Sequence, residues 1–401
     1  MKILVITQYF YPENLRINDL CFSLKEIGHE VTVLTGKPNY PLGNFYKGYG
    51  WFNKNTENIN GLKVYRSNLI PRGNSNVLRL FFNYVSFVIL GSIKLFFIKE
   101  KFDKIFVYAP SPITVGYVGI FASFLFRAKA FLWVHDLWPD SLKVAGKINN
   151  KLILFLVNLM TKSIYLFYET ILVQSPAFKK HLISQGVNKD KIIYYPYYAE
   201  AFYKIVKPKK SIKKLFPKGL NILFAGNIGV AQSFDTIIDA ARILNKKIKE
   251  LNFIILGEGR DKERILSKIS AHSLEKKFRF WGSFPPEEMS DFFACADALL
   301  VTLKNAKIFS MTIPGKLQSY LACGKPIIAS IDGVGAKIIR DSLCGYVSDS
   351  ENPKDLADSI YSFSKLDFKE KFKMGLNGRK VYEKEFERNK LLKRLIDIFE
   401  K

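Results

Sequence analysis

The sequence predicts an α/β protein of two doubly wound domains, each a parallel β-sheet with helices on both faces, facing each other across a cleft. Its 401 residues are too many for one hydrophobic core. Short apolar runs alternate with helical patterns along the chain, which is typical of parallel sheets. The alternation stops once, around residues 199–220, and then restarts. In such sheets, ligands bind beyond the carboxyl ends of the strands.

The first predicted domain spans residues 1–198. An amphipathic pattern over 18–28 predicts a helix between its first two strands. The opening segment MKILVITQYFYPE is too short and too aromatic in its apolar part for a signal peptide, so it predicts a buried strand. The strands are expected at residues 3–6, 30–34, 105–108, 131–134 and 171–173.

The second predicted domain spans residues 199–375 and begins with a lysine-rich stretch that is either a linker or simply a solvated charge run. Helices are expected at 234–247 and 287–295. A C-terminal helix, 376–401, is expected to pack back toward the first domain. The strands are expected at residues 221–225, 253–256, 278–281, 298–301 and 326–330.

The composition limits the possible partners and metal sites. A net charge of +25 favours an anionic partner: nucleic acid, an anionic membrane or a phosphorylated ligand. The four cysteines show no CxxC spacing and there are only four histidines, so neither a disulfide framework nor a metal site is expected. A reducing cytosol fits this cysteine usage best.

Three loops of the second domain follow the pattern of a phosphate site. Gly226–Gly229 and Gly257–Arg260 each follow a predicted strand directly, and Gly315-Lys316 opens a short helix. Glycines allow close backbone approach, and a helix N-terminus offers free N–H groups to an anion. Each feature alone could be an ordinary turn or helix start. No GxGxxG follows the first strand and no GxxxxGK[ST] occurs, which disfavours nicotinamide and P-loop sites.

With these residues in view, the chain resembles the GT-B fold glycosyltransferases of the GT4 group, whose two domains are Rossmann-like. Within that group it is most similar to the L-fucosamine-type transferases of bacterial capsule and O-antigen synthesis. The resemblance runs nearly end to end. The motifs that carry it are YFYPENLRIND (9–19), GHEVTVLTGKPNYPLG (28–43), WVHDLWPDS (133–141), FAGNIGVAQSFDTIIDAA (224–241), GEGRDKE (257–263) and IPGKLQSYLACGKPIIAS (313–330).

The resemblance implies transfer of a sugar from a UDP-sugar held by the second domain, with no metal or further cofactor and with retention of anomeric configuration. Lys316 would stabilise the departing diphosphate as a catalytic residue. The donor-binding residues would be Gly226, Asn227, Gly229, Gln232, Gly257, Gly259, Arg260, Ile313, Pro314, Gly315 and Ser319.

The chain departs from the family pattern at the donor site. Met311 and Ser319 stand where most relatives have two glutamates, the second of which holds the donor ribose. Asn227 and Gln232 stand near positions where many relatives have an arginine and a lysine. This implies either a rearranged donor site or an impaired enzyme.

The first domain would bind the acceptor. His135 and Asp136 directly follow a predicted strand and are the catalytic candidates there. His135 could contact the sugar or receive a proton. Asp136 could orient it or stabilise positive charge at the anomeric carbon, or could merely cap the next helix. The expected acceptor-binding residues are Tyr11, Glu13, Arg16, Asn39 and Tyr40.

Three apolar stretches of the first domain, 77–98, 113–127 and 151–168, mix aromatic with basic residues. In the first, the uncharged run between Arg79 and Lys94 has 14 residues, short of the ~20 that a spanning helix needs. Ordinary helices covering a sheet are one explanation. Peripheral attachment to the cytoplasmic face of the inner membrane is the other. It suits an acceptor glycan carried on a polyprenyl diphosphate.

Three other functions compete with this one. They are a UDP-sugar epimerase of the same fold, a catalytically inactive membrane-associated scaffold, and a nucleic-acid-binding protein. No helix-turn-helix, zinc-finger or RNP signature supports nucleic-acid binding, so none is expected. N-acetyl-L-fucosamine as the transferred sugar rests on the resemblance alone.

Overall fold

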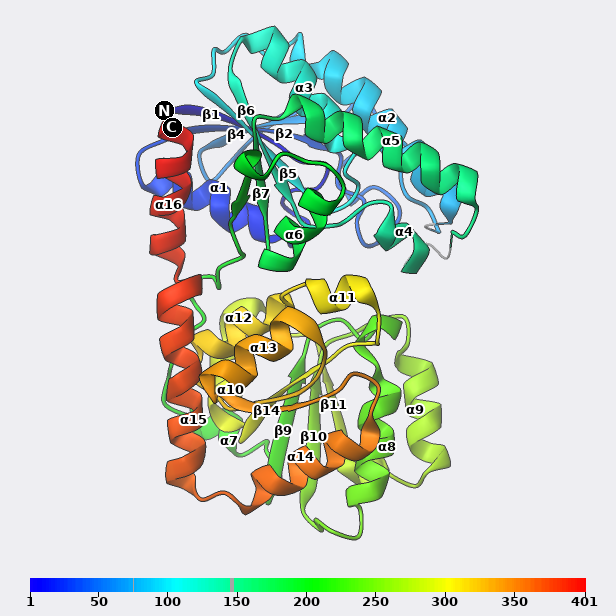
Figure 1. The fold of residues 1–401 in the computed structure, drawn as a ribbon, viewed down its shortest axis with the longest axis vertical. Helices are drawn as coiled ribbons and strands as arrows, with labels where there is room; N and C mark the ends of the chain where they lie inside the picture. The colour runs from blue at the N-terminus through cyan, green and yellow to red at the C-terminus, as the bar shows by residue number, and fades with distance from the viewer. Residues whose placement is uncertain (75, 145–147) are drawn as a thin grey trace. The chain divides into compact units, whose positions relative to one another are not determined.

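The computed structural model describes residues 1–74, 76–144 and 148–401. They form two compact units, the first containing Met1–Pro196 and Leu392–Lys401 and the second Tyr197–Leu391 (Figure 1). The chain leaves the first unit after Pro196, two residues before the predicted boundary. Tyr195 explains this, because it is fully buried and its carbonyl oxygen accepts a hydrogen bond from the Trp133 indole N–H at 3.0 Å.

Eight strands form the sheet of the first unit, in the order β3-β4-β2-β1-β5-β6-β7-β8. All neighbours are parallel except β3 and β4, which are antiparallel. The order reverses between β1 and β5, so the loops after these strands flank the switch point of the sheet. The strands are β1 (Lys2–Ile6), β2 (Glu30–Gly36), β3 (Thr56–Ile59), β4 (Leu62–Ser67), β5 (Lys104–Ala109), β6 (Lys129–Val134), β7 (Thr170–Val173) and β8 (Ile192–Tyr194).

Helices cover both faces of this sheet, with α2, α3 and α5 on one face and α1, α6 and α16 on the other (Figure 1). A short helix, α4, follows β6. The helices are α1 (Arg16–Glu26), α2 (Val77–Leu95), α3 (Val115–Phe126), α4 (Asp140–Val144), α5 (Lys151–Phe167), α6 (Pro176–Ser184), η1 (Lys189–Lys191) and α16 (Arg388–Glu400).

The end of the chain is not the single helix predicted for 376–401. It consists of the end of α15 (Phe368–Val381), a π-helical turn η5 (Tyr382–Phe386) and α16. Glu387 causes the break, because its carboxylate accepts the backbone N–H groups of Asn389 (3.1 Å) and Lys390 (2.7 Å) and so starts a new helix. The Phe399 ring of α16 packs in the first unit, 5.5 Å from the ring of Phe106 and 4.9 Å from that of Phe131.

Six parallel strands form the sheet of the second unit, in the order β11-β10-β9-β12-β13-β14. Helices α8, α9 and α14 share one apolar core with the strands. The order reverses between β9 and β12. The strands are β9 (Leu220–Ala225), β10 (Leu251–Leu256), β11 (Phe278–Gly282), β12 (Ala298–Thr302), β13 (Ile327–Ser330) and β14 (Gly345–Ser348). The helices other than α15 and η5 are α7 (Lys210–Lys213), η2 (Val230–Gln232), α8 (Phe234–Leu244), α9 (Lys262–Ala271), η3 (Glu275–Lys277), η4 (Pro286–Glu288), α10 (Met289–Cys295), α11 (Lys307–Met311), α12 (Gly315–Ala322), α13 (Gly333–Ser342) and α14 (Pro353–Lys365).

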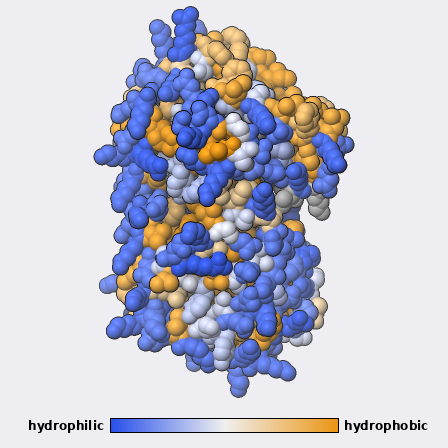
Figure 2. Space-filling view, viewed as in Figure 1, coloured by the Kyte–Doolittle hydropathy of each residue, from blue (hydrophilic) through white to orange (hydrophobic). Residues whose placement is uncertain are grey.

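Helices α2 and α5 turn large apolar side chains outward, and Figure 2 shows them as an orange area at the upper right. We call this surface the apolar face. Neither helix contains an acidic residue, nor does α3. Within the described residues, α2 alone is long and apolar enough to cross a membrane, and 17% of its 18-residue window is buried. The apolar face consists of Val77, Leu78, Phe81, Phe82, Ile89 and Ile93 of α2 and Leu152, Ile153, Phe155, Leu156, Leu159, Leu166 and Phe167 of α5.

Candidate functional site

The loop after β9 and helix α12 meet at the switch point of the second unit. Lys316, in the first turn of α12, donates from Nζ to Oε1 of Gln232 at 2.7 Å. The same Nζ lies 3.6 Å from the ring centroid of Phe224. Gly226 also lies next to this ammonium, because a Cβ added to Gly226 would be 3.4 Å from Lys316 Nζ. The structure therefore brings Lys316, Gln232 and Gly226 together, and Phe224 is a residue that sequence reasoning missed.

Burial changes the charge of this lysine. It lowers the pKa of the Lys316 ammonium to about 7, because the group loses water without gaining a carboxylate. The amine is thus near its titration midpoint at neutral pH. An anion placed beside it would favour the charged form, so this position suits a phosphate chemically.

Two predicted donor glycines serve packing between loops. A Cβ on Gly257, whose φ is +144°, would lie 1.9 Å from the carbonyl oxygen of Gly226. A Cβ on Gly259 would lie 2.0 Å from the carbonyl oxygen of Ile228. The backbone N–H of Ile228 also donates to the carbonyl of Glu258 at 2.9 Å. These glycines let the β10 loop lie directly on the β9 loop, so their own Cα positions face protein backbone.

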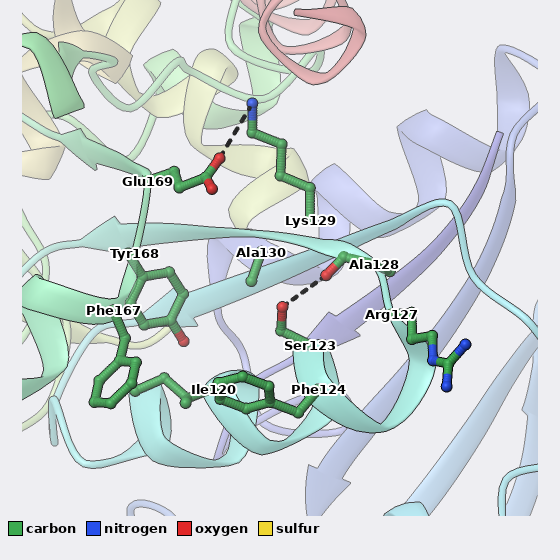
Figure 3. A pocket seen from close by; sticks show the side chains of 10 residues that line it. All are labelled: Ile120, Ser123, Phe124, Arg127, Ala128, Lys129, Ala130, Phe167, Tyr168 and Glu169. Atoms are coloured by element: carbon green, nitrogen blue, oxygen red, sulfur yellow. Dashed lines mark hydrogen bonds and ion pairs between the residues drawn. The ribbon is translucent and has the colours of Figure 1, made fainter.

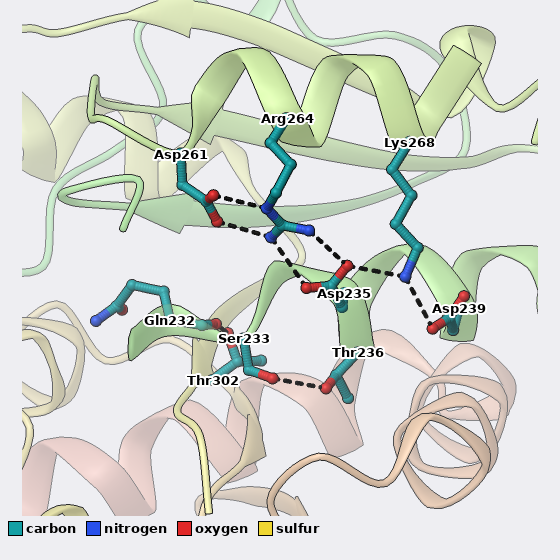
Figure 4. Close-up of polar contacts among 9 residues, drawn as sticks. All are labelled: Gln232, Ser233, Asp235, Thr236, Asp239, Asp261, Arg264, Lys268 and Thr302. Carbon is teal, nitrogen blue, oxygen red and sulfur yellow. Dashed lines mark hydrogen bonds and ion pairs between the residues drawn. The ribbon is translucent and has the colours of Figure 1, made fainter. Parts of the chain in front are cut away.

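Side chains outside the predicted set hold the β9 loop in place (Figure 4). The Thr302 hydroxyl, at the end of β12, donates to the carbonyl oxygen of Gln232 at 2.5 Å. Arg264 of α9 joins Asp261, after the β10 loop, to Asp235 in the first turn of α8, at 2.7 and 2.9 Å. Its guanidinium lowers the pKa of Asp235 to about 2. Asp235 and Asp261 lie within two of the motifs but have no predicted role, and Arg264 and Thr302 lie outside the motifs. Thr302 could have been found as the last residue of a strand at the switch point.

The remaining predicted donor residues divide by exposure. Asn227 and Arg260 are exposed, Gly229 and Gly315 are partly exposed, and Ile313, Pro314 and Ser319 are buried. Ser319 is 4% exposed inside α12, and Met311, at the other non-family position, is 9% exposed at the end of α11.

In the first unit, His135 and Asp136 follow β6 directly. The His135 ring lies 4.8 Å from that of Tyr108 and 4.2 Å from that of Trp133. Burial lowers the pKa of His135 well below its usual value, as does the charge of Arg16, so the imidazole is neutral at pH 7. Burial raises the pKa of Asp136, opposed by hydrogen bonds that include one from Trp138 Nε1 at 3.3 Å. A neutral imidazole can accept a proton.

Two predicted acceptor residues are engaged in holding loops. Glu13 is 1% exposed, and its carboxylate accepts the backbone N–H groups of Phe10 (3.0 Å), Asn39 (2.8 Å) and Tyr40 (2.7 Å). Burial raises the pKa of Glu13 to about 7 despite these bonds. The Asn39 side chain, fully buried, donates to the carbonyl of Lys37 at 2.9 Å. Both residues therefore position the loop after β2.

Tyr11 and Tyr40 are the exposed members of the acceptor set, at 46% and 40%, and Arg16 is partly buried. Sequence reasoning missed Arg72, whose Nη1 donates to the Tyr9 hydroxyl at 2.8 Å and whose guanidinium lies 5.1 Å from the ring centroid of Tyr40. An arginine between Pro71 and Gly73, just before a long acid-free apolar stretch, was the available signal.

A cavity of about 310 Å³ lies at the opposite edge of the first sheet (Figure 3). It is lined by the end of α3 and the residues that begin β6 and β7, including Phe124, Lys129 and Glu169. The Lys129 ammonium and the Glu169 carboxylate are 3.8 Å apart. None of the predicted site residues lines this cavity.

Residues 206–381 match the family described as "Glycosyl transferases group 1". The chain matches this family over less than half of its length. It is 26% identical over 340 residues to the putative colanic acid biosynthesis glycosyl transferase WcaI of Escherichia coli, covering 81% of this chain and 82% of that protein.

Solved structures share the GT-B fold of this chain. Sucrose-phosphate synthase of Thermosynechococcus elongatus has a TM-score of 0.76 and 16% identity, covering 100% of this chain and 98% of that one. HepE of Anabaena, solved in complex with UDP and glucose, has a TM-score of 0.70 and 15% identity, covering 100% and 99%. The predicted fold class, two doubly wound parallel-sheet domains, is thus confirmed.

Within the described residues, no group of three or more His, Cys, Asp or Glu side chains is arranged to hold a metal ion. Metal independence itself stays a prediction.

Proposed function

We propose that this chain is a GT-B glycosyltransferase of the GT4 group that transfers a sugar from a UDP-sugar to a glycan carried on a polyprenyl diphosphate. The reaction would serve bacterial capsule, O-antigen or exopolysaccharide synthesis. The observation that carries the proposal is the convergence of Lys316, Gln232 and the Gly226 turn at the switch point of the second unit. Among the relatives, WcaI is named for colanic acid biosynthesis and HepE was solved with UDP.

In the proposed reaction, an acceptor hydroxyl oxygen forms a bond to the anomeric carbon while the bond from that carbon to the β-phosphate oxygen breaks. UDP departs with the electron pair, and the acceptor hydroxyl loses its proton. The Lys316 ammonium and the N-terminus of α12 offset the charge that develops on the diphosphate. His135, neutral at pH 7, is the proposed proton acceptor on the first unit. Retention of configuration and the absence of a metal are part of the proposal.

The sugar proposed for transfer is N-acetyl-L-fucosamine, a member of the N-acetylhexosaminyl class. This choice follows the resemblance of the chain to L-fucosamine-type transferases. It is the part of the proposal that a panel of UDP-sugars would test most directly.

Binding of UDP tests the proposed donor. In a thermal-shift titration of the full chain, UDP at ~100 times its dissociation constant should stabilise the fold by about 2.7 kcal/mol, and GDP and NAD should give smaller shifts. A shift with UDP that disappears in Lys316→Ala would support the donor site. If no nucleotide shifts the midpoint, the inactive scaffold replaces the enzyme, in keeping with Met311 and Ser319.

The proposed location is the cytoplasmic face of the inner membrane, bound peripherally through the apolar face. Exposed aromatic and aliphatic side chains beside basic but no acidic residues suit an interface with anionic lipid. Charge on both Arg79 and Lys94, near the two ends of α2, favours a helix lying in the interface over one crossing it.

Leu156→Glu should reduce binding to the membrane without affecting stability. Leu156 is 55% exposed on α5, so the substitution removes interfacial apolar area and adds repulsion from anionic lipid. Sedimentation with phosphatidylglycerol vesicles should show at least a tenfold loss of binding and an unchanged melting temperature. Phe368→Glu, at a residue that is 83% exposed in the second unit, is the matched control and should bind as the wild type does. Equal binding by wild type and Leu156→Glu would remove the apolar face from the proposal.

A further inference from the structure

Two arginines, Arg72 before α2 and Arg79 in its first turn, have no acidic partner in the part of the chain that the structure describes. Among the described residues, no carboxylate lies within 4.0 Å of the guanidinium of Arg72 or of Arg79. Residues 68–98 contain no aspartate or glutamate at all. An arginine is always charged, so these side chains hold two positive charges that the protein itself does not neutralise.

The two side chains converge on one loop. The Arg72 guanidinium is held by the Tyr9 hydroxyl at 2.8 Å and lies over the Tyr40 ring, while its backbone N–H donates to Oδ1 of Asn39 at 3.2 Å. The Arg79 side chain folds back from α2 onto the next residue, so that a Cβ on Gly73 would be 3.5 Å from Arg79 Nε. Arg72 is therefore fixed in direction, and the Arg79 side chain packs on Gly73, the residue that follows Arg72.

This loop continues directly into the apolar face. Val77, Leu78, Phe81 and Phe82 form the exposed start of α2 and are between 44% and 64% exposed. The buried side of this part of α2 contacts the loop after β1, where Gln8 Nε2 donates a hydrogen bond to Asn83 Oδ1 at 2.7 Å. One short stretch of the molecule thus presents paired positive charge at one end and apolar surface at the other.

We propose that Arg72 and Arg79 bind the diphosphate of a polyprenyl diphosphate-linked acceptor, with its lipid chain lying along the start of α2. The inference rests on the proposed function and names the residues that position the acceptor. Diphosphate oxygens accept charge-assisted hydrogen bonds from guanidinium groups, often in pairs, which suits two arginines. The lipid chain covers exposed Phe81 and Phe82. Tyr40, which is 40% exposed under the Arg72 guanidinium, remains available for the attached sugar, as does Tyr11, which is 46% exposed.

The test uses the full chain with saturating UDP, which fills the donor site, and three probes: farnesyl diphosphate, farnesol and inorganic pyrophosphate. Calorimetric titration should show the tightest binding for farnesyl diphosphate. Arg72→Gln and Arg79→Gln should each weaken that binding about tenfold, and the double variant more. Arg127→Gln, at an exposed arginine at the end of α3, is the matched control and should bind as the wild type does.

The Arg79 variant should not disturb folding, because within the described part of the chain the Arg79 side chain makes no hydrogen bond or ion pair, whereas the Arg72 side chain donates to the Tyr9 hydroxyl. Undiminished binding by Arg79→Gln and Arg72→Gln, or equal binding of farnesol, would overturn the proposal. Equal binding of inorganic pyrophosphate would mean a site for free phosphates and would also overturn it. If UDP gives no thermal shift while the arginine dependence holds in titrations without UDP, the proposed function fails and the lipid-diphosphate site stands.

Discussion

Lys316→Gln is expected to lower the turnover number about 10²- to 10³-fold, because it removes the positive charge nearest the proposed leaving diphosphate. The glutamine side chain is uncharged but still carries an N–H group that can donate a hydrogen bond to Gln232. UDP release from the donor, followed with purified enzyme and acceptor-bearing membranes, measures the effect. Lys337→Gln, at an exposed lysine on α13, is the control and should leave turnover unchanged. A Lys316→Gln enzyme with full activity would show that the charge is supplied elsewhere.

The pH dependence of UDP binding gives this prediction a second readout. The pKa of Lys316 is about 7 in the free protein, and bound diphosphate should raise it. Affinity for UDP should therefore be highest below pH 7 and fall by up to tenfold per pH unit from 7 toward 9. In Lys316→Arg the charge persists over that range, so calorimetry should show a flat profile. A flat wild-type profile would separate Lys316 from the diphosphate.

Gly257→Ala is expected to destabilise the second unit by about 4 kcal/mol, among the larger effects of single substitutions. The new Cβ would lie 1.9 Å from the Gly226 carbonyl oxygen, and a φ of +144° is strained for alanine. Chemical denaturation followed by circular dichroism measures the loss. Because the β10 loop would be pushed off the β9 loop, UDP affinity should fall with stability.

Gly282→Ala separates the two causes of that loss. Its φ is also positive, at +81°, but its nearest neighbour would be the Glu258 side chain at 3.6 Å. In this variant only the backbone strain remains, so the free energy of unfolding is expected to fall by about 1 kcal/mol. Equal losses in the two variants would mean that steric contact between the loops contributes nothing.

The fold class could be predicted because the central strands are continuous apolar runs between helices. Four strands were not predicted: β8 has only three residues, and β3, β4 and β14 are not apolar on both sides. β3 lies at the edge of its sheet and is exposed or half-exposed throughout, and β14 is mostly half-buried at the edge of the other. β4 contains Arg66, which is 1% exposed and pairs with Glu57 at 2.7 Å. A buried charge that is satisfied by a residue on the neighbouring strand cannot be recognised in sequence.

The candidate site could be predicted where a residue's position in a helix or loop indicates its role. Lys316 follows from its position in the first turn of a helix after a strand, and the structure sets its Nζ against Gln232. The sequence predicts ligand contacts for Gly257 and Glu13, whereas in the structure both residues contact other loops. A sequence motif shows that a residue type is required at a position, but it does not show which group lies next to that residue. Arg72 belongs to no motif, and its importance comes from what surrounds it.

The last ten residues belong to the first unit, where Phe399 fills a place between Phe106 and Phe131. During synthesis, the ribosome finishes the first unit only after it has made the whole of the second. Until then the sheet of the first unit lacks part of its cover, and the apolar side chains beneath Phe399 stay exposed to water. A chain truncated before Phe399 would thus lack part of the core of its first unit, although the truncation lies almost 300 residues after Phe106.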